Sequence, residues 1–103
     1  MPKPTIYEQM SRQYLGIAAI QIDLLSHYDS DGKERRTQEL YDVSHQSMIE
    51  EQSEKSLEKM DELIRKYQGE IKEFREENPD VESSKKVRKK IRELEKLCSS
   101  CDI

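Results

Sequence analysis

The amino-acid sequence predicts an all-α protein: an elongated, antiparallel three-helix arrangement of coiled-coil-like helices around one long central helix. The 103 residues include only three glycines and three prolines, the residues that most strongly interrupt helices. Apolar residues recur at steps of three and four over most of the chain, which places them on one face of a helix. Turn residues cluster at 29–32 and 78–80. We therefore expect helices at about residues 5–28, 34–78 and 81–98 in a single domain of residues 1–103, with the last few residues frayed.

The composition predicts a thin hydrophobic core. Charged residues make up 39% of the chain and hydrophobic residues 33%, a balance that leans towards disorder. The net charge is only −4, however, so the chain repels itself weakly. Because the apolar residues also follow a helical period, we expect a folded protein.

The first predicted helix carries an unusually broad apolar face. Thr5 and Glu8 form a capping box at its start. Tyr14, Ile17 and Leu24 lie on its heptad seam, and further apolar residues on either side widen the stripe. A helix this apolar must be covered on more than one side.

The second predicted helix is long because no proline interrupts it before Pro79. Its later half has strict heptad spacing at Leu57, Met60, Ile64, Tyr67, Ile71 and Phe74. The apolar residues of its earlier half lie on a face rotated from that of residues 57–74. One four-residue stutter in the heptad pattern joins the two halves. The polar segment 50–56 contains no Gly or Pro, so we favour a straight helix of about 68 Å over a kink that would give a compact bundle. A layer that is only two helices thick buries little apolar surface, so we expect a homo-oligomer or a hetero-complex.

The third predicted helix combines an apolar seam with a basic strip. Val87, Ile91 and Leu94 extend the seam. A possible charged partner surface consists of Lys85, Lys86, Arg88, Lys89 and Arg92. Residues 34–82 carry 8 basic and 15 acidic groups, whereas residues 83–103 carry 7 basic and 3 acidic groups. We expect the basic strip to face acidic groups across the hairpin or across a dimer, and so to set the register of the helices.

Nucleic acid is a weaker candidate partner for this strip. The whole chain is acidic, and no aromatic residue is interleaved in the basic stretch to stack on a base. The longest uninterrupted apolar run, Ile17–Ile20, is far too short to span a membrane. We therefore expect a protein partner, no membrane, and a cytoplasmic location with a nuclear one as the alternative.

No catalytic, cofactor-binding or metal-binding site is expected. Cys98 and Cys101 form a CxxC pair at the end of a helix, where the helix dipole disfavours a thiolate. We interpret them as a continuation of the apolar seam and leave open a zinc site that two copies would share. Asp29 and Asp31 resemble the start of a calcium loop, but the glycine and the final glutamate of such a loop are misplaced.

The third predicted helix resembles the last helix of BAG-type co-chaperones. The resemblance rests on its basic start, on Ile91 and Leu94, and on the ending Cys101-Asp102. It implies binding to the nucleotide-binding domain of a heat-shock chaperone. The sequence thus predicts a non-enzymatic adaptor or assembly subunit that acts through helix faces, with a BAG-like co-chaperone or regulator of a larger partner as the alternative.

Overall fold

In the computed structural model, which describes residues 6–49 and 54–100 without the side chains of residues 47–49, every regular element is helical. The elements in chain order are α1 (Ile6–Ser26), the short 3-10 helix η1 (Ser30–Gly32), α2 (Lys33–Ile49), α3 (Glu54–Glu77), η2 (Pro79–Ser83) and α4 (Lys85–Ser100). The all-α prediction is confirmed. The three-helix prediction is wrong, because the described residues form four α-helices.

The break before α4 follows from local chemistry. Pro79 disfavours helical geometry at Asn78, and α3 ends at Glu77. The Asn78 backbone N–H and side-chain amide both donate to the Phe74 carbonyl, which satisfies one of the last carbonyls of α3. Thr5, the predicted cap of the first helix, lies outside the described residues.

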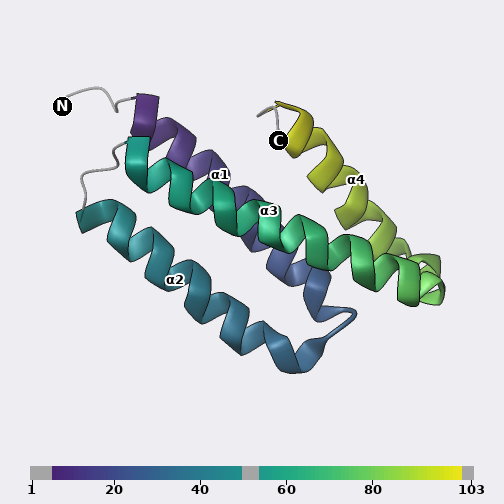
Figure 1. Ribbon diagram of the computed structural model, residues 1–103. Coiled ribbons are helices and arrows are strands. Elements are labelled where there is room, and N and C mark those ends of the chain that lie inside the picture. The colour runs from purple at the N-terminus through teal and green to yellow at the C-terminus, as the bar shows by residue number, and fades with distance from the viewer. Residues whose placement is uncertain (1–5, 50–53, 101–103) are drawn as a thin grey trace.

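The helices α1 and α3 form a central parallel pair, and α2 and α4 lie on opposite sides of it (Figure 1). Gln21 bonds to Ile64, and the rings of Tyr28 and Phe74 stack at 5.9 Å between centroids. The nearly constant offset in numbering between these partners shows that α1 and α3 run in the same direction. No Cα atom of α2 lies within 8 Å of a Cα atom of α4 within residues 6–49 and 54–100.

The predicted long central helix is absent, because α2 and α3 are separate helices that run in opposite directions. The helix α2 packs antiparallel to α3, and the longest dimension of the molecule is 47 Å, too short for the predicted helix of about 68 Å. Residues 50–53, where we expected the helix to continue, lie outside the described residues. This arrangement lets the chain's own α2, α3 and α4 cover the broad apolar face of α1. We expected a second copy or another protein to contribute to that cover.

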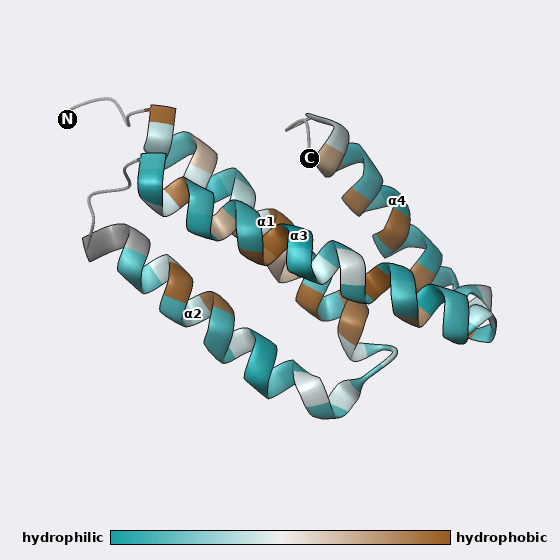
Figure 2. Ribbon diagram, viewed as in Figure 1, coloured by the Kyte–Doolittle hydropathy of each residue, from teal (hydrophilic) through white to brown (hydrophobic). Residues whose placement is uncertain are grey.

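The hydrophobic core follows the central pair and extends under α4. Its fully buried members include Ile17, Leu24, Leu25, Ile64 and Tyr67. Apolar residues of α4 gather on the side turned towards α1 and α3, and polar residues cover the outer side (Figure 2). This division makes α4 an amphipathic helix packed on the pair by one face.

Candidate functional site

The inner face of α4 rests on α1. Val87, Ile91 and Leu94 are buried in the core. Lys90 donates a hydrogen bond to the carboxylate of Asp23, and this bond holds the pKa of Asp23 below its usual range. The α4 helix is therefore held to the central pair chiefly by three apolar side chains and one ion pair to α1.

The outer face of α4 carries the predicted basic strip. All five of its members are exposed: Lys85, Lys86, Arg88, Lys89 and Arg92. None of them forms an ion pair with any residue in the part of the chain that the structure describes. The expectation that the strip faces acidic groups of the central helix across the hairpin is therefore wrong. The reason is that α4 approaches α1, whereas Glu73, Glu76 and Glu77 of α3 are exposed to solvent.

An open groove separates α4 from α3. Within the described ranges no Cα atom of α3 lies within 8 Å of one of α4, and the space between the two helices has a volume of about 460 Å³. Its floor is apolar and consists of Leu24, Ile71, Ile91 and Leu94, each less than 10% exposed. Its polar walls are Gln68 and Arg75 of α3 and Glu95, Cys98 and Ser99 of α4. The two walls touch where the Gln68 side-chain amide donates to the Cys98 sulfur at 3.6 Å.

Gln21 of α1 brings an unsatisfied polar atom to this groove. Its side chain is 1% exposed and lines the groove. Its Nε2 donates to the Ile64 carbonyl at 3.0 Å, whereas its Oε1 is buried without a donor. The carbonyl of Ile64 can only accept, so this bond fixes which end of the amide is the nitrogen. A buried acceptor without a partner is unusual and calls for an explanation.

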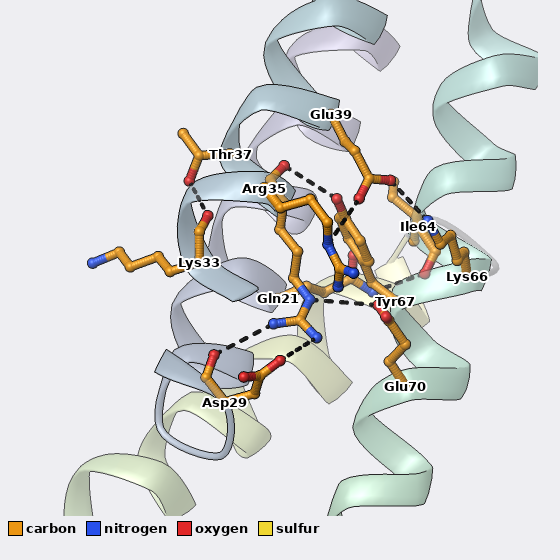
Figure 3. A network of polar contacts seen from close by, with 11 residues as sticks. Gln21, Asp29, Lys33, Arg35, Thr37, Glu39, Ile64, Lys66, Tyr67 and Glu70 are labelled. Atoms are coloured by element: carbon orange, nitrogen blue, oxygen red, sulfur yellow. Dashed lines mark hydrogen bonds and ion pairs between the residues drawn. The ribbon is translucent and has the colours of Figure 1, made fainter. Parts of the chain in front are cut away.

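The side of the molecule opposite α4 is held by a polar network around Arg36 (Figure 3). The Arg36 side chain is 2% exposed and forms ion pairs with Asp29 at 3.2 Å and Glu70 at 3.6 Å. The Tyr67 hydroxyl donates to the Arg36 carbonyl at 3.1 Å, and burial raises the pKa of Tyr67 to about 12. A Cβ atom on Gly32 would lie 2.5 Å from both the Arg36 guanidinium and the Asp29 carboxylate, so a side chain at this position would displace their ion pair. These contacts fix α2 and η1 on the pair.

The structure brings most predicted seam residues into one core. The buried ones are Ile17, Leu24, Leu57, Met60, Ile64, Tyr67, Ile71, Val87, Ile91 and Leu94, whereas Tyr14 and Phe74 are half-buried. Leu57 and Met60 lie apart from the others, outside the continuous core cluster. Leu57 instead lines a hollow with Tyr7, Met10 and Tyr14 near the start of α1. The apolar seam of α3 therefore does not pack on α4 near its start, at Leu57 and Met60.

Two features of the site escaped the sequence analysis. Gln21 stands out in the sequence only as a polar residue at a heptad position of an apolar helix, and this is the signal that could have identified it. Arg36 has no such signal, because a charged residue in a charged helix segment predicts exposure. Both side chains are buried because neighbouring helices cover parts of α1 and α2 that lie outside their stripes of apolar residues.

The described residues show neither a membrane span nor a metal-ligand cluster. No helix within residues 6–49 and 54–100 is long and apolar enough to cross a membrane. No group of three or more His, Cys, Asp or Glu side chains in those ranges could hold a metal ion. Cys98 is half-buried on the groove wall. Cys101 lies outside the described residues, as does Asp102, so the ending on which the resemblance to BAG-type co-chaperones partly rests is not described.

Comparison with known proteins gives no match to a protein-family model, to a curated protein or to a solved structure. The function must therefore be argued from the site itself.

Proposed function

We propose that this chain is a non-enzymatic protein-interaction module, an adaptor or assembly subunit that binds an acidic protein partner through the α4 side of its bundle. The observation that carries the proposal is the exposed basic strip of α4, defined by Lys85, Lys86, Arg88, Lys89 and Arg92. In a chain of net charge −4, five neighbouring cations without an ion pair in the described part of the chain form a local positive field. Such a field steers and orients an acidic partner.

The surroundings of the strip favour a protein partner over nucleic acid. Duplex DNA is a continuous array of phosphates, and it would meet repulsion from the acidic residues that α3 exposes at Glu73, Glu76 and Glu77. The basic stretch of α4 offers no aromatic side chain for stacking. A protein can match a small positive patch beside an acidic helix more easily than a uniformly charged polymer can.

Charge reversal of the strip tests the proposal. The variant Arg88→Glu/Arg92→Glu removes two cations from the outer face of α4. The matched control Lys33→Glu/Lys55→Glu changes the net charge equally at exposed sites in the first turns of α2 and α3, where glutamate is favourable. Binding to a glutamate-rich helical peptide and to a duplex DNA of similar charge would be measured by fluorescence anisotropy at several salt concentrations.

We expect the wild-type chain to bind the peptide more tightly than the DNA. Reversal at the strip should weaken peptide binding by about tenfold or more, as loss of central charged contacts does, whereas the control variant should bind like the wild type. Equal weakening by both variants would show that only net charge matters. Tighter binding to DNA than to the peptide would replace the proposal with a nucleic-acid function.

A further inference from the structure

We infer that the groove between α1, α3 and α4 receives an amphipathic, acidic α-helix of the partner, with apolar side chains on the groove floor and carboxylates on its basic rim. This inference rests on the proposed function and specifies its binding mode. The four features that support it are the shape of the groove, an unsatisfied acceptor, the charge of its rims and the poor fit of a second copy of the chain.

The shape of the groove suits apolar side chains. Its volume of about 460 Å³ falls in the range of ordinary ligand sites, and such sites are predominantly apolar with a few polar groups. The floor residues Leu24, Ile71 and Leu94 come from three different helices. An elongated apolar groove between helices is the standard receptor for the apolar face of another helix.

Gln21 supplies the polar anchor point. Its Oε1 is buried and has no donor, while Nε2 is held by the Ile64 carbonyl. Because this oxygen is out of contact with solvent, a serine, threonine or asparagine side chain, or a free N–H in the first turn of an incoming helix, satisfies it once the Gln21 side chain shifts towards the groove. The unbound protein thus keeps an acceptor ready beside the apolar floor.

The α4 rim of the groove is basic near the start of the helix. Arg88, Arg92, Glu95 and Ser99 follow one another at steps of four, three and four, so they lie on one face of α4. Glu95 and Ser99 line the groove, and this places the exposed Arg88 and Arg92 along the same edge. Two members of the basic strip, Arg88 and Arg92, therefore continue the groove-facing edge of α4 beyond the residues that line the groove.

The α3 rim also carries cations. Gln68, Lys72 and Arg75 are spaced four and three apart and share a face of α3. Gln68 and Arg75 line the groove, and Lys72 is exposed between them. Arg75 also pairs with Glu82 at 2.5 Å, which leaves Lys72 as the freer cation on this side. Arg75 and Glu95 are the charged residues that line the groove, and the exposed Lys72, Arg88 and Arg92 lie on the helix edges beside it. An occupant that places carboxylates over these three cations is therefore acidic.

A second copy of this chain does not fit the description of the occupant. Its strongly acidic helix is α3, but the apolar residues of α3, such as Ile64 and Tyr67, are fully buried in its own core. The α3 helix of a second copy could therefore offer carboxylates but no apolar face. The occupant is therefore a helix of a different protein.

Three synthetic 16-residue peptides of known composition test the inference by fluorescence anisotropy. The first carries leucines at helical three- and four-residue spacing and glutamates elsewhere. The second replaces each leucine with glutamine, and the third replaces each glutamate with lysine. We expect the first peptide to bind at least about tenfold more tightly than the other two, because only it fills the groove and meets the rim cations.

Two neighbouring substitutions locate the binding site. Ser99→Trp fills the groove from an exposed position on its wall, whereas Ser100→Trp places the same side chain on an exposed neighbour that does not line the groove. We expect Ser99→Trp to weaken binding of the leucine peptide by about tenfold and Ser100→Trp to leave it nearly unchanged. Because both positions are exposed, both variants should keep the wild-type helix content and melting temperature.

The outcomes separate the groove from the proposed function. Equal binding of the leucine and glutamine peptides, or equal effects of the two tryptophans, would overturn the groove while leaving the basic strip as a binding surface. Failure of both acidic peptides to bind would overturn the groove and the proposed function together.

Discussion

The two outer helices are attached to the α1–α3 pair in different ways. On one side, α2 is held by polar groups that are largely removed from water: Arg36 with Asp29 and Glu70, and Tyr67 with the Arg36 carbonyl. On the other side, α4 rests on α1 through apolar residues and stands away from α3 across the groove. A helix fixed to both members of the pair closes the core, whereas a helix fixed mainly to one member leaves a surface on which a partner can bind.

The largest difference between the two sides is expected from core truncation. Ile64, fully buried in α3, has no solvent beside it, whereas Leu94 is buried but lines the groove. Ile64→Ala should cost near the upper end of the usual range of about 2–5 kcal/mol, because the cavity stays enclosed, and Leu94→Ala should cost near the lower end. Urea unfolding measures both, with the exposed Glu62→Ala as a control expected within about 0.5 kcal/mol. A larger cost at Leu94 than at Ile64 would contradict the description of α4 as the loosely attached helix.

Removal of one cation from each side sharpens the comparison. Arg36→Ala leaves Asp29 and Glu70 without their buried partner and should lower the unfolding free energy by about 3 kcal/mol. That is the low end for a broken buried pair, since both carboxylates keep some contact with water. Lys90→Ala breaks a more exposed pair with Asp23 and should cost at most about 1 kcal/mol. Equal losses in chemical denaturation would mean that the Arg36 network does not hold α2 more firmly.

The smallest expected effect is on how the free energy of unfolding changes at alkaline pH. Burial, and then the charges of Glu39 and Glu70, raise the pKa of Tyr67 from 10.0 to about 12. Its protonated form is thus favoured in the folded state, so this contribution to stability is complete below pH 10 and is lost as the pH rises to about 12. Tyr67→Phe should cost about 1 kcal/mol at neutral pH through the lost hydrogen bond. Its unfolding free energy should then fall less steeply than the wild type's between pH 10 and 12, and parallel curves would count against the buried phenol.

The sequence was a good guide to helix identity and a poor guide to the path of the chain. The hydrophobic period and the turn residues predict α1, the end of α3 before Pro79 and the apolar face of α4. They fail between Ile49 and Glu54, where the chain reverses although residues 50–56 include no Gly or Pro. Two signals favoured the reversal: the stripe of α1 needed cover on several sides, and the apolar face before residue 50 was rotated against the face after it. Burial of α1 outweighed the absence of helix breakers.

The groove could not be predicted from the sequence for a related reason. The spacing of Val87, Ile91 and Leu94 predicts that α4 packs by one face, but the spacing is the same whether that face lies on α1 or α3. The choice depends on where α2 lies, because α2 covers one side of the pair and leaves the other side for α4. The exposed basic residues were identifiable in advance, whereas the apolar floor beside them depends on the tertiary arrangement.

The central claim is that the α4 side is the binding face. The most direct test of it is chemical-shift mapping with ¹⁵N-labelled protein. The protein would be titrated with the leucine-containing acidic peptide while backbone and side-chain amide signals are followed. We predict the largest changes in the side-chain amides of Gln21 and Gln68 and in the backbone of α4 from Arg88 to Ser99, with little change in α2. Changes centred on α2 and the Arg36 network, or spread evenly over all four helices, would contradict the account.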